Sequence, residues 1–135
     1  MQTIDSFMER RKHQRFQLKP GAYAVLSPNL IKLGQIIDIS ESGLAFRYIR
    51  YRKASNDDAD TDVLLYGKNM YVDKISFQLV EDVELSNPGI FSSVLMNKCS
   101  LSFEDISPSQ LDKIKLFINN HVVDEWRQHR IIVNK

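Results

Sequence analysis

The chain has 135 residues, of which 43% are hydrophobic and 26% are charged, as in an ordinary globular domain. Its 18 Lys and Arg residues nearly balance its 17 Asp and Glu residues, which argues against a general polyanion-binding protein. A single cysteine excludes an internal disulfide, and no apolar run is long enough to span a bilayer. We therefore expect one cytoplasmic domain without membrane insertion.

Cations are concentrated at the start of the chain. Residues 9–19 contain five Lys or Arg residues and one acid, and Pro20-Gly21 then interrupts the pattern. We expect residues 1–19 to form a flexible basic arm and residues 20–135 to form the folded domain.

Short stretches of alternating apolar and polar residues follow the arm, separated by turn signals such as Pro28-Asn29 and Asn87-Pro88-Gly89. A polar, acidic segment over residues 52–62 is expected to be a loop, and Gly34 is expected to mark a bulge or bend. The expected strands cover residues 22–27, 30–39, 44–51, 63–66, 70–85 and 90–104.

The period changes at Ser107-Pro108-Ser109-Gln110, where an N-cap Ser precedes a Pro at the first helical position. Apolar residues at helical spacing follow, so we expect a helix from 108 to about 121. The pattern therefore predicts a mainly β fold: a six-stranded antiparallel β-barrel with a C-terminal α-helix. Closure into a barrel removes the exposed edges that a flat sheet would leave.

Two short motifs carry binding chemistry. Arg11 and Arg15 form an R-x-x-x-R motif, and arginine is the preferred side chain for phosphate because its charge is permanent and its donors are paired. A solvated basic arm is the alternative interpretation of these residues. The second motif is a turn, in which Asp38 can accept two hydrogen bonds, Ser40 supplies a hydroxyl and Gly43 permits a positive φ. A hairpin turn that satisfies only its own backbone is the alternative there.

Together the motifs resemble the signature of the PilZ domain family, bacterial receptors for cyclic di-GMP. The family pattern is R-x-x-x-R in an N-terminal loop, followed by D/N-x-S-x-x-G after the second strand. The segments Glu9-Arg10-Arg11 and Asp105-Ile106-Ser107-Pro108 also resemble the family, so the resemblance covers nearly the whole chain. It implies the same six-stranded barrel with a C-terminal helix.

The resemblance also implies roles for the site residues. Arg11 and Arg15 would bind the ligand's phosphates and stack on guanine, while Asp38 and Ser40 would hold a guanine edge. Gly43 would shape the turn. Arg10, directly before the motif, would favour binding of a stacked pair of ligands. One departure is Ser100, which stands where many relatives have a glycine before the final strand's Phe, and which would narrow the ligand's seat.

The leading functional hypothesis is a stand-alone cyclic di-GMP sensor whose arm becomes ordered on the ligand and which signals to an unidentified effector protein or through a homodimer. A ligand-independent protein-binding adaptor is the second hypothesis. The third is a single-stranded nucleic-acid-binding barrel that stacks bases on Phe46, Tyr48 or Tyr51, which the near-neutral net charge disfavours.

No catalytic residues are identified, so the protein is not expected to be an enzyme. Its three histidines are scattered, and Asp58 to Asp62 lack the glycine and the bidentate Glu of a calcium loop. We therefore expect no metal site and no cofactor other than the cyclic di-GMP ligand.

Overall fold

The computed structural model describes residues 13–50, 59–85 and 95–123, and it confirms the predicted fold class. Residues 86–94, which include the predicted strand start at Ile90, lie outside the described part of the chain. The elements are β1 (Phe16–Gln17), β2 (Tyr23–Ser27), β3 (Leu33–Ser40), β4 (Gly43–Ile49), β5 (Asp62–Gly67), β6 (Met70–Leu85), β7 (Met96–Phe103) and α2 (Pro108–His121).

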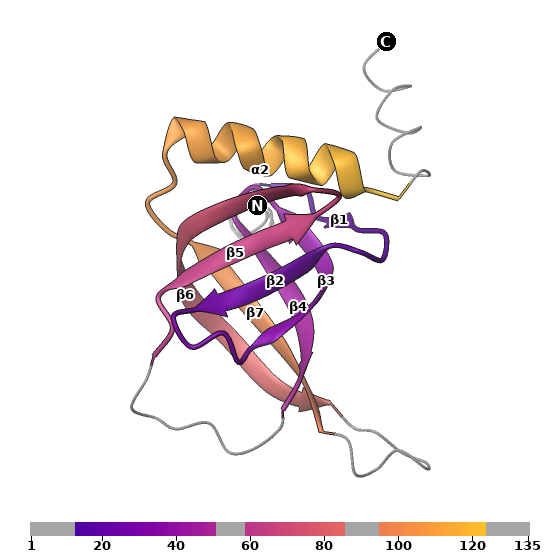
Figure 1. The fold of residues 1–135 in the computed structure, drawn as a ribbon, viewed down its shortest axis with the longest axis vertical. Helices are drawn as coiled ribbons and strands as arrows, with labels where there is room; N and C mark the ends of the chain where they lie inside the picture. The colour runs from indigo at the N-terminus through magenta and orange to yellow at the C-terminus, as the bar shows by residue number, and fades with distance from the viewer. Residues whose placement is uncertain (1–12, 51–58, 86–94, 124–135) are drawn as a thin grey trace, which may run out of the picture.

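Six of the strands close into an antiparallel barrel (Figure 1). Their order is β3-β2-β5-β6-β7-β4, and β4 pairs back onto β3. The short strand β1 adds to β3 outside this ring, and α2 lies across one end of the barrel. Within the described residues, no helix is long and apolar enough to cross a membrane.

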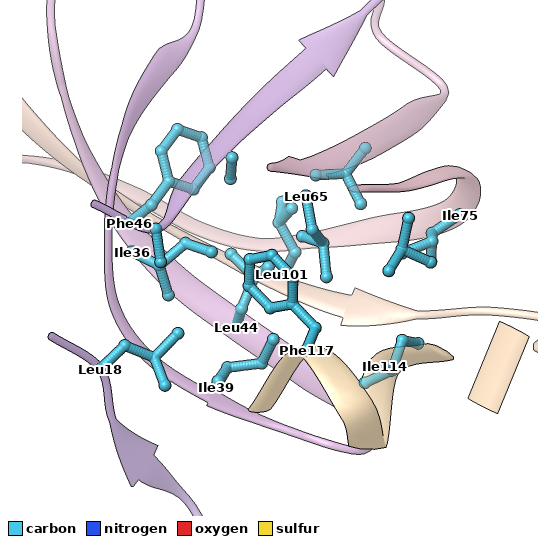
Figure 2. Close-up of a cluster of buried hydrophobic side chains, with 14 of the residues drawn as sticks. Leu18, Ile36, Ile39, Leu44, Phe46, Leu65, Ile75, Leu101, Ile114 and Phe117 are labelled. Atoms are coloured by element: carbon cyan, nitrogen blue, oxygen red, sulfur yellow. The ribbon is translucent and has the colours of Figure 1, made fainter. Parts of the chain in front are cut away.

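The barrel interior is filled by the inward residues of each strand, and the helix closes one end (Figure 2). Phe117 of α2 is fully buried and points among Ile39, Leu44 and Leu101. The predicted helix start is confirmed: Ser107 is the N-cap, and its side chain exchanges hydrogen bonds with Gln110 in a capping box. The helix therefore begins and docks as its sequence pattern predicts.

A partly buried polar cluster links strands β4, β6 and β7 with Lys32. Asp82 accepts hydrogen bonds from Tyr48, Asn97 and Lys32 at 2.8 to 2.9 Å. Burial disfavours the charged Asp82 carboxylate, but these donors outweigh burial and hold its pKa below the usual value. Burial and the bond to Asp82 raise the pKa of Tyr48. The Asp82 carboxylate is thus paired within the cluster, whereas the buried Oδ1 of Asn97 has no hydrogen-bond partner.

Gly34 does not mark the bulge that its sequence context suggested. The register shift in β3 lies between Ile36 and Asp38 instead. A Cβ on Gly34 would lie 1.5 Å from the carbonyl oxygen of Arg47 on β4, so the glycine is required by close contact between the two strands.

The folded domain also begins earlier than the predicted boundary at residue 20. Phe16 and Leu18 belong to the core, with exposed fractions of 9% and 7%. Phe16 pairs with Ile39 of β3, and Leu18 forms a β-bridge with Val122 just after α2. The two apolar side chains at alternate positions are buried together, which removes residues 16–18 from the predicted arm.

His121 is buried at the C-terminal end of α2, with an exposed fraction of 1%. Its Nδ1 donates to the carbonyl oxygen of Phe117 at 2.7 Å, and its Nε2 has no hydrogen-bond partner. Burial is the main cause that lowers the pKa of His121, and the nearby Lys68 ammonium acts in the same direction. The folded protein therefore holds this imidazole neutral.

We expect this burial to make stability depend on pH. The unfolded chain takes up a proton at His121 below about pH 6.5, whereas the folded chain resists it until lower pH. The contribution of the neutral His121 to stability is therefore fully present above about pH 6.5 and is lost as the pH falls below it. Urea unfolding of wild type and His121→Gln between pH 8 and pH 5 measures this. The free energy of unfolding should fall less in the variant than in wild type over this range. An equally steep decline in the variant would contradict the assignment.

Candidate functional site

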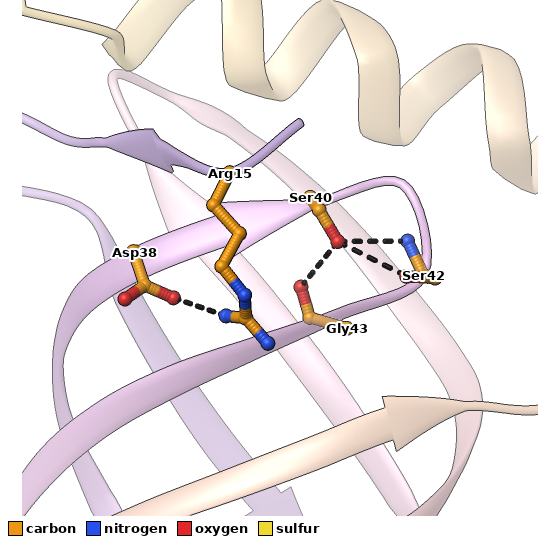
Figure 3. Close-up of polar contacts among 5 residues, drawn as sticks. All are labelled: Arg15, Asp38, Ser40, Ser42 and Gly43. Atoms are coloured by element: carbon orange, nitrogen blue, oxygen red, sulfur yellow. Dashed lines mark hydrogen bonds and ion pairs between the residues drawn. The ribbon is translucent and has the colours of Figure 1, made fainter. Parts of the chain in front are cut away.

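Arg15 and Asp38 form an ion pair on the outer surface of the barrel (Figure 3). One Nη of Arg15 donates to one carboxylate oxygen of Asp38, and the side chains are 45% and 26% exposed. Exposed ion pairs of this kind contribute only about 0–1 kcal/mol, so an anionic ligand can compete for the guanidinium at little cost. The second Asp38 oxygen and the other Arg15 nitrogens make no contact with the residues drawn in Figure 3.

Local pairing explains why Arg15 reaches Asp38. Gln17 of β1 pairs with Asp38 itself, which sets the register of the residues just before the strand. The backbone of Lys19 donates to His121 at 2.8 Å and that of Val123 donates to Gln17 at 3.3 Å, so β1 is held by both β3 and the end of α2. We call residues 13–15 the lead-in, because they directly precede this anchored strand.

The lead-in also approaches the tip of the β3–β4 hairpin. Nδ1 of His13 lies 3.7 Å from a carboxylate oxygen of Glu41, an ion pair when the imidazole is protonated. His13 and Arg15, two positions apart, thus contact two positions of the same hairpin. The R-x-x-x-R and D-x-S-x-x-G motifs are therefore brought together at Arg15 and Asp38, while Arg10 and Arg11 lie outside the described residues.

Ser40 lies at the end of β3 with only 2% of its surface exposed. Its Oγ accepts from the backbone of Ser42 at 3.1 Å, lies 3.2 Å from the Ser42 hydroxyl, and donates to the Gly43 carbonyl at 3.5 Å. The hydroxyl thus stabilises the turn (Figure 3). These contacts are the ones expected of a hairpin turn that satisfies only its own backbone, which is the alternative interpretation of this motif.

The reason for glycine at position 43 differs from the expected one. Among the described residues, the glycine with a positive φ is Gly21. A Cβ on Gly43 would instead lie 2.2 Å from the carbonyl oxygen of Leu101 on β7. Gly43 is needed because β4 and β7 approach too closely here for a side chain at this position.

A pocket of about 350 Å³ lies beside the ion pair. Asp38, Ala45 and Ser100 are successive cross-strand partners on β3, β4 and β7, and Ala45 and Ser100 are small. Their size leaves room above the strands. The residues that line the pocket are His13, Arg15, Asp38, Ser40, Ser42, Ala45, Lys98 and Ser100.

Five lining residues were not among the predicted ligand-binding residues: His13, Ser42, Ala45, Lys98 and Ser100. Strand alternation places Lys98 and Ser100 on one face of their strand, but it does not specify which strand lies beside it. Ser100, the departure from the family pattern, does line the pocket.

The pocket is suited to binding an anion. It combines the cations of Arg15 and Lys98 with hydroxyl groups and one carboxylate. Within the described part of the chain, no group of three His, Cys, Asp or Glu residues is arranged to hold a metal ion. Cys99 is buried, and burial raises the pKa of its thiol to about 12, so it is not a nucleophile at neutral pH.

Comparisons with known proteins agree with this architecture. No protein-family model and no curated protein matches the chain. The solved PilZ domain of YcgR from Escherichia coli, with c-di-GMP, is similar to it with a TM-score of 0.60 and 16% identity, over 93% of this chain and 98% of that one. The structure of YcgR from Escherichia coli in complex with c-di-GMP also has a TM-score of 0.60, at 14% identity, over 93% of this chain.

The chain spans 50% of the length of that second YcgR structure. At these identities the similarity concerns the fold. The chain therefore has the fold of a PilZ domain, as the two sequence motifs implied.

Proposed function

We propose that this protein is a receptor for cyclic di-GMP and has no catalytic activity of its own. The observation that carries the proposal is the juxtaposition of Arg15 and Asp38 at the edge of a polar pocket. The PilZ fold supports it, because the similar solved structures contain c-di-GMP. A ligand with central phosphates and peripheral guanine edges presents the complementary groups.

Arg15 would bind a phosphate of the ligand. A phosphate oxygen replaces Asp38 as the acceptor, and the guanidinium then donates to it in a charge-assisted pair. Asp38, released from Arg15, would accept from the ring N–H and the exocyclic amine of guanine, a pattern that adenine lacks. Ser40 and Gly43 would act on this contact indirectly, by fixing the turn that follows Asp38.

Removal of the Arg15 side chain should weaken cyclic di-GMP binding by about 10- to 100-fold. This range corresponds to the roughly 1.5–3 kcal/mol that a hydrogen bond to a charged group contributes. Isothermal titration calorimetry of wild type and Arg15→Ala with cyclic di-GMP measures the change.

Arg50→Ala is the matched control for this titration. Arg50 also forms an exposed ion pair between strand segments, with Glu84 at 2.8 Å, but it does not line the pocket. The control should bind like wild type. Equal affinity in wild type and Arg15→Ala would contradict the proposed role of Arg15.

We further propose that residues 1–12, with Arg10 and Arg11, close over the pocket when the ligand binds. The lead-in runs from this segment directly to the pocket wall at His13 and Arg15. The newly ordered segment would create a surface for an effector protein or for a second copy of the chain. The cost of ordering it would reduce the affinity for the ligand.

Ligand-dependent protection of this segment tests the closing movement. Hydrogen exchange measured by mass spectrometry should show residues 1–12 exchanging more slowly when cyclic di-GMP is bound. Arg11→Ala should reduce that protection while residues of the barrel exchange as before. Identical exchange with and without saturating ligand would refute the closing movement.

The two other functions are less well supported. A ligand-independent protein-binding adaptor would not need the pocket beside Arg15, so the pocket gives that hypothesis no support. The nucleic-acid hypothesis relied on stacking by Phe46 and Tyr48, but these side chains are 0% and 4% exposed, so that part of it is wrong, and Tyr51 lies outside the described residues. Exposed rings do form a cross-strand row on β2, β5 and β6, on strands that do not line the pocket: Tyr23, Tyr66 and Tyr71.

A further inference from the structure

Two cations lie directly opposite each other on the outer surface of the barrel. Arg47 of β4 and Lys98 of β7 are cross-strand partners. The next residues in the same row are Gln35 on β3 and Val83 on β6, so the row contains no carboxylate. Within the described part of the chain, neither cation forms an ion pair.

This arrangement is unfavourable without an anion. Like charges directly opposite on neighbouring strands repel each other. Two other exposed cations of the barrel have acidic partners: Arg15 contacts Asp38, and Arg50 contacts Glu84. No acid stands directly opposite Arg47 or Lys98 in this row, so their two charges raise the positive potential at this position.

The cation pair adjoins the pocket on the side away from the lead-in. Lys98 lines the pocket from β7, whereas Arg15 contacts Asp38 on β3. Strand β4 separates the two, which places the backbones of β3 and β7 about 10 Å apart across the pocket. The small side chain of Ala45 on β4 lies between them, opposite the equally small Ser100 on β7.

We propose that Lys98 is a second phosphate-binding position of this site, and that the neighbouring Arg47 adds to the positive potential there. The inference rests on the proposed function, because a cyclic dinucleotide carries two phosphodiesters on opposite sides of its ring. Arg15 binds one phosphate and Lys98 binds the other. The bound phosphate also removes the repulsion between Lys98 and Arg47, so ligand binding gains from relief of an unfavourable contact in the free protein.

Lys98→Gln tests this position in the full chain. Calorimetric titration with cyclic di-GMP should show about a tenfold loss of affinity and a weaker dependence of affinity on salt, because one charge contact is removed. Without ligand, the variant's melting temperature should equal or exceed that of wild type, since the repulsion is gone. Lys98→Arg, which keeps the charge, should retain most of the affinity.

Lys113→Gln is the matched control, because Lys113 is exposed on α2 and does not line the pocket. It should bind like wild type at every salt concentration. Arg47→Gln gives an independent second variant, and it should cause a smaller loss than Lys98→Gln.

The outcomes separate the two proposals. Wild-type affinity and salt dependence in both Lys98→Gln and Arg47→Gln, together with weak binding by Arg15→Ala, would overturn the second phosphate position and leave the receptor function intact. Failure of the wild-type protein to bind cyclic di-GMP would overturn both.

Discussion

The contact between Arg15 and Asp38 joins the lead-in to the barrel at the position where a ligand would bind. Arg15 reaches Asp38 because Phe16 and Leu18 are buried immediately after it and set the register of β1 on β3. Burial of two apolar side chains contributes roughly 1.5–3 kcal/mol each, much more than the exposed ion pair itself. Core packing therefore positions the arginine, and the weak pair leaves it available to an anion.

The same packing lets the end of α2 hold the strand that positions Arg15. Leu18 forms its bridge with Val122, and Lys19 donates to His121 at the end of α2. The helix thus holds the strand that carries the arginine, although none of its residues lines the pocket. Loss of helix docking would release β1 and with it Arg15, so the stability of the barrel end and the geometry of the site are coupled.

Much of this architecture is predictable from the sequence. Alternation predicts the strands, and the Ser107 cap with the apolar spacing after it predicts the helix, because both depend on local chemistry. The motifs predict Arg15 and Asp38. The contribution of Lys98 is not predictable, because strand alternation does not specify which residues of distant strands lie opposite each other. For the same reason, the close approach of Leu101 on β7 that requires Gly43 could not be predicted.

The account predicts that cyclic di-GMP contacts both walls of the pocket beside Arg15. Amide chemical shifts of the ¹⁵N-labelled protein during a titration with cyclic di-GMP test this most directly. The account predicts saturable shifts concentrated at His13, Ser42, Lys98 and Ser100. The absence of saturable shifts, or shifts confined to the β2–β5 face, would contradict it.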